Sequence, residues 1–151
     1  MNMFLLSLLM HITGLTLAAG TTFIGYLMNR RFWKFYVTDK AKALTVMELG
    51  ARLPRIIGIG MGLLVLSGFF MMYLTKGVFA EQLWFRIKVI LVLLGIGGGF
   101  VARSLDKKMN ALIAADNSLG IDSLKRQMML FYLVQLLLFF SIFVLGVFKF
   151  N

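Results

Sequence analysis

Four long apolar runs, separated by basic or polar segments, dominate the chain. The first run, from Met1 to Tyr26, contains no Lys, Arg, Asp or Glu. Because a transmembrane helix needs about 20 apolar residues, each run is long enough to cross a bilayer. The predicted spans cover residues 4–28, 54–74, 83–102 and 128–148. This pattern predicts one all-α domain over residues 1–151, an integral membrane four-helix bundle.

The segments between the spans also carry helical patterns. Residues 38–53 place apolar side chains at helical spacing: Ala41, Leu44, Met47 and Ala51. We expect a short helix there, either lying at the membrane surface or running into the next span. The third span should continue as a helix to about Ala115, and Asp122 is the expected N-cap of the last helix.

Small residues recur within the apolar runs at a spacing of four. Such residues let neighbouring helices, or a flat ligand, approach the backbone closely. The pairs are Gly14 with Ala18, Gly58 with Gly62, and Gly95 with Gly99, and Gly60 and Gly68 add further small positions to the second span. The last two pairs are GxxxG motifs, and they predict close helix packing.

Composition supports a membrane location. Of the 151 residues, 60% are hydrophobic, and the mean hydropathy is +0.90. A soluble domain is nearer half apolar, so the surplus should face lipid. Without a basic region before it, and with so long an apolar run, the first segment is expected to be a membrane helix rather than a signal peptide. The absence of cysteine excludes disulfides, thiolate sites and c-type haem attachment.

The net charge is +10, and the basic residues cluster between the apolar runs. This placement is typical of membrane topology rather than of nucleic-acid binding. Seven Lys and Arg residues lie between Asn29 and Arg55, and five lie between Ala102 and Gln127. The loop at 75–88 has three and the C-terminal tail has one. The positive-inside rule therefore places the first and third connections in the cytoplasm, with short helical extensions there. We expect a multi-pass protein of the inner (plasma) membrane with both termini outward.

Two ionisable side chains are candidates for chemistry inside the membrane. His11, the only histidine, lies about 10 Å deep in the first span, and Lys88 lies about 6 Å deep in the third span from the same face. The two could therefore converge inside the bundle. Ionisable residues within spans are functional candidates by default. His11 could ligate a metal or haem iron, carry a proton, or simply hydrogen-bond between helices.

The other candidates have a structural interpretation beside the functional one. Lys88 could snorkel to the interface, or it could be an axial ligand, a base or the partner of a haem propionate. Arg52 is either a topology anchor or a residue that binds an anionic headgroup or a propionate. Gly14 either packs a helix or gives a porphyrin clearance. The methionines mostly fill the core, although one could be a sixth haem ligand. No acidic residue lies in mid-span, which excludes a Ser-His-Asp triad and a carboxylate pair there.

Three motifs together resemble a known family. They are MHITG at 10–14, MELGARLPRIIGIGMGLLVLSGFF at 47–70 and LWFRIKVILVLL at 83–94. Their order and spacing are similar to those of the HemJ-type membrane protoporphyrinogen IX oxidases and of related small four-helix membrane haem proteins of the CopD-like kind. In place of that family's Trp-x-Ala-Gly in the first span, this chain has Leu17-Ala18-Ala19-Gly20.

The resemblance implies a b-type haem and an essential pair, the histidine of the first helix and the lysine of the third. Those roles would fall on His11 and Lys88, with Gly14 and Arg52 as further cofactor-binding candidates. The implied reaction oxidises protoporphyrinogen IX to protoporphyrin IX and passes electrons to the respiratory chain. With a single histidine, we expect five-coordinate iron, His11/Lys88 ligation, or ligands shared across a homodimer. The competing expectation is a non-enzymatic membrane protein, either a haem redox or sensing module or a small transporter subunit.

Overall fold

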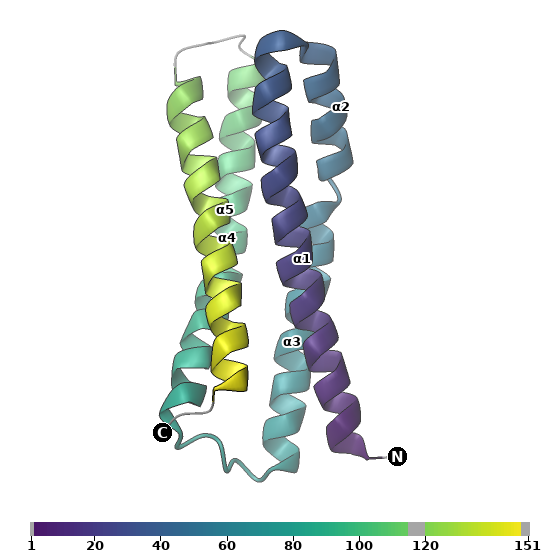
Figure 1. Ribbon diagram of the computed structural model, residues 1–151, viewed down its shortest axis with the longest axis vertical. Helices are drawn as coiled ribbons and strands as arrows, with labels where there is room; N and C mark the ends of the chain where they lie inside the picture. The colour runs from purple at the N-terminus through teal and green to yellow at the C-terminus, as the bar shows by residue number, and fades with distance from the viewer. Residues whose placement is uncertain (1, 115–119, 149–151) are drawn as a thin grey trace.

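The computed structural model describes residues 2–114 and 120–148, and regular structure in these ranges is α-helical (Figure 1). The helices are α1 (Met3–Thr38), α2 (Lys40–Gly50), α3 (Leu53–Leu74), α4 (Leu83–Ala114) and α5 (Ile121–Val147). Four stretches are long and apolar enough to cross a membrane: α1, α2 together with α3, α4, and α5. The predicted all-α architecture with four candidate spans is therefore confirmed.

The long helices alternate in direction along one common axis (Figure 1). α1 runs from one end of the molecule to the other, α2 and α3 return along it, and α4 and α5 form a second antiparallel pair. Met3 and Val147 therefore lie at the same end, together with the turn between α3 and α4. We call the opposite end, where α1 ends and α5 begins, the basic end, because twelve of the sixteen Lys and Arg residues lie near it.

α1 is longer than the predicted span. Its 36 residues measure about 54 Å, whereas the hydrocarbon core of a bilayer is about 30 Å thick. The predicted limit at residue 28 marked the approach of basic residues, but Lys and Arg are good helix formers and do not end a helix. The helix ends only at Asp39, whose backbone is extended (φ −158°).

α2 confirms the short helix predicted at 38–53. It stands beside the final third of α1, parallel to the axis of the bundle, and Ala43 is fully buried in that contact (Figure 1). A break of two residues, Ala51 and Arg52, separates it from α3. Of the two predicted placements, the helix running into the next span is the one observed.

The interior contains two separate groups of buried side chains. The first, at the basic end, joins α1, α2, α4 and α5 through Phe32, Trp33, Ala43, Leu105, Met109, Leu124 and Met128. The second, lower in the bundle, joins α1, α3 and α5 through Ala18, Met61, Phe139 and Ile142. α2 is thus the fourth helix of the bundle at the basic end, and α3 takes its place at the other end.

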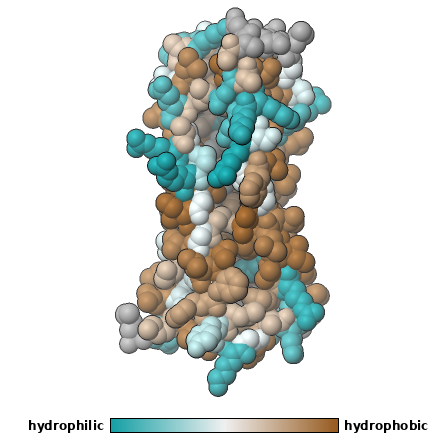
Figure 2. All heavy atoms as spheres, turned by 180° about the vertical axis from the view of Figure 1, so that it is seen from behind, coloured by the Kyte–Doolittle hydropathy of each residue, from teal (hydrophilic) through white to brown (hydrophobic). Residues whose placement is uncertain are grey.

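Large apolar side chains cover much of the outer surface, especially around the middle of the molecule (Figure 2). Leu66, Phe69, Leu93 and Leu137 are each more than half exposed. Hydrophilic residues gather toward the two ends in the same view. This distribution is the one expected when lipid, rather than water, covers the central belt.

The predicted glycine contacts are only partly correct. Gly14 and Ala18 pack against α3 as expected, but their partner is Gly60. A Cβ atom added to Gly58 or Gly62 would meet nothing within 4 Å. Gly60 lies on the face of α3 that contacts α1. Gly58 and Gly62 are two positions away from it on either side, so they point to other faces of the helix.

The predicted glycine pair of α4 is also only partly in contact with other helices. There Gly98 faces the side chain of Gln135, Gly95 lies near Met61, and Gly99 has open space. The predicted N-cap of α5 also shifts, because Gly120 occupies that position in a left-handed conformation (φ 97°) and Asp122 lies in the first turn.

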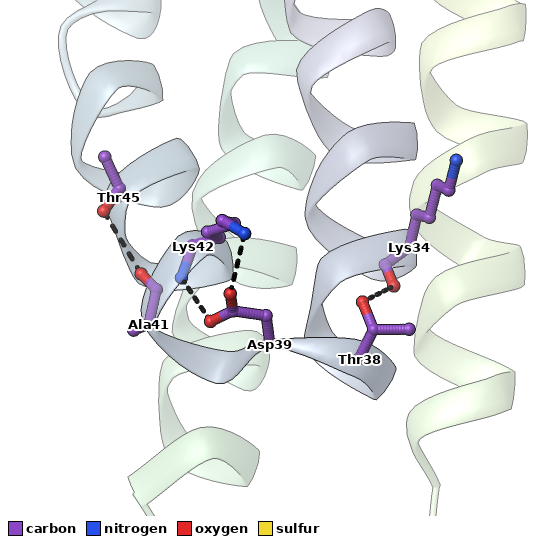
Figure 3. A network of polar contacts seen from close by, with 6 residues as sticks. All are labelled: Lys34, Thr38, Asp39, Ala41, Lys42 and Thr45. Atoms are coloured by element: carbon purple, nitrogen blue, oxygen red, sulfur yellow. Dashed lines mark hydrogen bonds and ion pairs between the residues drawn. The ribbon is translucent and has the colours of Figure 1, made fainter.

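A small polar network forms the corner between α1 and α2 (Figure 3). The Asp39 carboxylate accepts a hydrogen bond from the backbone N–H of Lys42 (3.1 Å) and pairs with its ammonium (3.1 Å). Asp39 is therefore the N-cap of α2, and its C=O accepts the first helical bond, from Ala43. Thr38 and Thr45 donate to the carbonyl oxygens of Lys34 and Ala41.

This cap predicts a pH dependence confined to the corner. The hydrogen bond from the Lys42 backbone, followed by that from its side chain, lowers the pKa of Asp39. A carboxyl whose folded pKa is lowered stabilises the fold above its unfolded pKa, about 3.9, and loses that effect as the pH falls through the folded value. Asp39→Ala should speed hydrogen exchange at the first amides of α2 at neutral pH. Asp39→Asn, which keeps an acceptor, should change the exchange less and remove its pH dependence below about pH 4.

Candidate functional site

The candidate site lies where α1 and α3 come closest. A Cβ atom on Gly14 would stand 2.7 Å from the carbonyl oxygen of Gly60 and from the amide nitrogen of Leu64. A Cβ atom on Gly60 would in turn stand 2.7 Å from the Ala18 nitrogen. The two backbones therefore touch, which only small residues allow. This contact fixes the position of the side chains one or two turns away.

His11 lies one turn before Gly14, half-buried against α3. Its Nδ1 atom is 3.0 Å from the hydroxyl oxygen of Ser67, a side chain that is 3% exposed. The ring also lies beside Gly68, where an added Cβ would be 3.5 Å from the His11 Cε1. The imidazole is thus held at its Nδ1 edge by a buried partner on another helix.

The hydrogen bonds of Ser67 indicate which nitrogen of His11 carries a proton. The Ser67 hydroxyl donates to the carbonyl oxygen of Leu63 (2.5 Å), and the Leu64 carbonyl oxygen is 3.1 Å away. A hydroxyl has one proton, so an oxygen that donates to a carbonyl must accept from the ring. With the hydroxyl proton on the Leu63 side, Nδ1 of His11 carries the ring proton and Nε2 keeps its lone pair. This tautomer is the one that binds a metal through Nε2.

Lys88 reaches the same part of the bundle from α4. The side chain is half-buried, and its Nζ lies 3.4 Å from the position that a Cβ atom on Gly146 of α5 would occupy. Its charge interacts electrostatically with His11. The two residues that the depth argument selected are therefore near each other across the bundle, and their functional roles stay predictions.

The other predicted site residues are placed differently. Gly14 is buried in the α1–α3 contact, which is its packing role, and its role in cofactor binding stays a prediction. Arg52 is exposed at the junction of α2 and α3. Fifteen residues, or about 22 Å of helix, separate it from Ser67. The structure therefore does not bring Arg52 to the His11 site.

Two of the buried polar side chains that sequence reasoning missed lie within the spans that follow α1. Ser67 is the only serine or threonine of α3, and its position among apolar residues was the available signal. Gln135, in the middle of α5, is 8% exposed and lies against Gly98. Within the described ranges its Oε1 atom has no hydrogen-bond partner. It was a single amide in an apolar span, a residue type that is costly there.

The donor set suits a porphyrin iron better than a bare metal ion. Within residues 2–114 and 120–148, no group of three or more His, Cys, Asp or Glu side chains could hold a metal. Haem iron already has four porphyrin nitrogens and needs only one or two axial ligands from the protein. The oriented imidazole of His11 fits that requirement. Comparisons with protein-family models, with curated proteins and with solved structures found no match for this chain.

Proposed function

We propose that this chain is a multi-pass membrane protein that binds a b-type haem through His11. The observation that carries the proposal is the 3.0 Å contact between Nδ1 of His11 and the buried hydroxyl of Ser67, which holds the ring by its Nδ1 edge. With Nδ1 as the protonated nitrogen, Nε2 would be the atom that binds iron. Histidines that ligate metals usually donate their other ring N–H to such a partner, which orients the ring. Here the partner is itself fixed by a backbone carbonyl of the same helix.

Lys88 is the second functional group of the proposal. Its charge lies close enough to His11 to interact with it, and two helices, α4 and α5, shape its surroundings. An ammonium near a haem would pair with a propionate carboxylate. The same group could instead ligate the iron or act as a base. A homodimer that shares ligands is also compatible with the single histidine.

The proposed activity follows the resemblance to the HemJ-type oxidases. Bound at His11, haem would supply one-electron transfer. His11 would hold the cofactor, while Lys88 would pair as an ammonium with a carboxylate of the substrate or, as the neutral amine, accept a proton that the oxidation releases from the macrocycle. We propose the oxidation of protoporphyrinogen IX as the reaction, with electrons passed to the respiratory chain. The non-enzymatic alternative is a haem redox or sensing module.

Reconstitution with haemin tests the proposal. The purified protein in detergent should develop a Soret band that saturates at a fixed ratio of haem to chain. A saturating band together with oxidation of protoporphyrinogen IX supports the enzyme. A saturating band without turnover restricts the function to redox transfer or sensing. A colourless protein contradicts haem binding and favours a transporter subunit or a packing module.

Replacing Ser67 with alanine should weaken haem binding without abolishing it. The variant removes the acceptor of the His11 ring N–H, so the imidazole loses its fixed orientation. Loss of such a supporting partner typically costs about 10–100-fold in metal affinity. Haem titration of Ser67→Ala measures the effect, and Ser141→Ala is the matched control, because that serine bonds only within α5. Equal affinities in the two variants would contradict the role given to Ser67.

We also propose that the basic end faces the cytoplasm of a cell bounded by an inner membrane. Twelve basic residues near that end against four elsewhere support this orientation. The chain has no cysteine, so single-cysteine variants can be labelled without a background. In intact spheroplasts, a membrane-impermeant maleimide should label Val78→Cys at once and Ala41→Cys only after lysis. The reverse pattern would invert the topology.

A further inference from the structure

A cavity lies at the basic end, far from His11. It is open to the surface and has a volume of about 290 Å³ between α1, α2, α4 and α5. Its lining includes Phe32, Met47, Glu48, Asp106, Met109 and Asn110. Phe32 and His11 are 21 residues apart on α1, about 32 Å along the helix. The cavity is therefore separate from the proposed haem site and needs its own explanation.

Asp106 is the unusual residue of this cavity. Its side chain is half-buried, although this end of the molecule is rich in Lys and Arg. Arg103 lies three positions before it on α4, and Lys107 and Lys108 follow it, but all three side chains are exposed. Within the described part of the chain no hydrogen bond or ion pair of Asp106 is found, and its charge lies near Tyr132 of α5. A half-buried carboxylate without a direct partner is costly.

The rest of the lining indicates what kind of partner would fit. Thioethers and an aromatic ring form much of the wall, from Met47, Met109 and Phe32. Methionine adapts to irregular apolar ligands, and an aromatic face attracts organic cations. A hard metal ion would need about six oxygen ligands. The side-chain oxygens of the lining come from Glu48, Asp106 and Asn110, and the amide oxygen of Asn29 already accepts a hydrogen bond from the indole of Trp33. These three side chains offer five oxygens, fewer than such an ion needs.

We propose that this cavity binds a small lipophilic organic cation, an ammonium ion with an apolar body. The positive group would pair with Asp106, and the carbon body would pack on Met47, Met109 and Phe32. A volume of about 290 Å³ is at the small end of the range for ligand sites in proteins. The cavity lies between α2 and the ends of α1 and α4. A bound ligand would therefore contact all three helices and stabilise the basic end.

Calorimetric titration of the full-length protein in detergent tests this with benzyltrimethylammonium as the probe. The wild type should bind it saturably. Its uncharged isostere neopentylbenzene should bind about tenfold or more weakly, because it cannot pair with Asp106. Asp106→Asn should lower the affinity for the cation by about the same factor and leave the affinity for the isostere unchanged. The matched control is Asp122→Asn, an exposed acidic residue at the same end, which should bind like the wild type.

Two further variants keep the test decisive if Asp106→Asn does not fold. Asp106→Glu retains the charge and should retain binding, whereas Met47→Trp fills the cavity and should abolish it for both probes. Equal binding of the cation by wild type and Asp106→Asn would overturn the proposal. So would the absence of saturable binding in the wild type, or displacement of the probe by potassium at an equal concentration.

Discussion

His11→Ala is expected to weaken strongly the Soret band that the wild-type protein develops with haemin. The substitution removes the only imidazole of the chain, and with it the free Nε2 atom of the proposed iron ligand. Neither Ser67 nor Gly68, the residues beside the ring, can replace that donor. The measurement is a haemin titration followed by absorbance, with reduced-minus-oxidised spectra as a second readout.

The control for this variant is Thr13→Ala. Thr13 lies on the same helix, two positions away, and its hydroxyl bonds within α1 to the carbonyl oxygen of Leu9. Its replacement should leave the Soret band unchanged. Added imidazole should restore part of the band in His11→Ala, because the space left by the ring can accept it. A full Soret band in His11→Ala without imidazole would remove the basis of the proposed function.

Gly60→Ala is expected to destabilise the bundle more than any other glycine-to-alanine change in α3. The new Cβ would stand 2.7 Å from the amide nitrogen of Ala18 and 2.9 Å from the carbonyl oxygen of Gly14. These are backbone atoms, which cannot turn aside as a side chain can, so α1 and α3 must separate. Overpacking of this kind costs about 1–3 kcal/mol. Thermal unfolding in detergent should therefore show a lower Tm.

Gly62→Ala is the control, since an added Cβ there meets nothing within 4 Å. Alanine has the higher helix propensity, so this variant should be neutral or slightly stabilised. The two variants also separate packing from chemistry. Gly60 is two turns from Ser67, so its replacement should weaken haem binding as well, whereas Gly62→Ala should not. Equal Tm values for the two variants would contradict the backbone contact between α1 and α3.

The sequence predicted the elements of the fold well because each span is a long apolar run. The continuation of α1 to Thr38 was not predicted, since basic residues mark the edge of a membrane but do not end a helix. Glycine spacing gave the right pair on α1 and the wrong pairs on α3 and α4. Each glycine-rich run offers several faces, and only the partner helix selects one of them.

The site was predictable only in part. His11 and Lys88 were found because ionisable residues in apolar runs are conspicuous, and depth along a helix follows directly from residue number. Ser67 was not found, because a lone serine in a helix usually bonds to a carbonyl one turn back, and this one does so too. Its second role depends on the register between α1 and α3, which the backbone contact at Gly14 sets.

The uneven contacts between helices have a mechanical consequence. α1 is joined closely to α3, and α4 is joined to α5, but α3 and α4 meet only sparsely, so the two pairs are held together mainly by the α1–α5 seam. A rotation of one pair against the other about that seam would widen or narrow the spacing between α3 and α4. His11 and Ser67 would move together with α1 and α3, while Lys88 would move with α4 and α5. Because His11 lies on α1, at the seam, such a motion would change the distance from Lys88 to Ser67 more than the distance from Lys88 to His11.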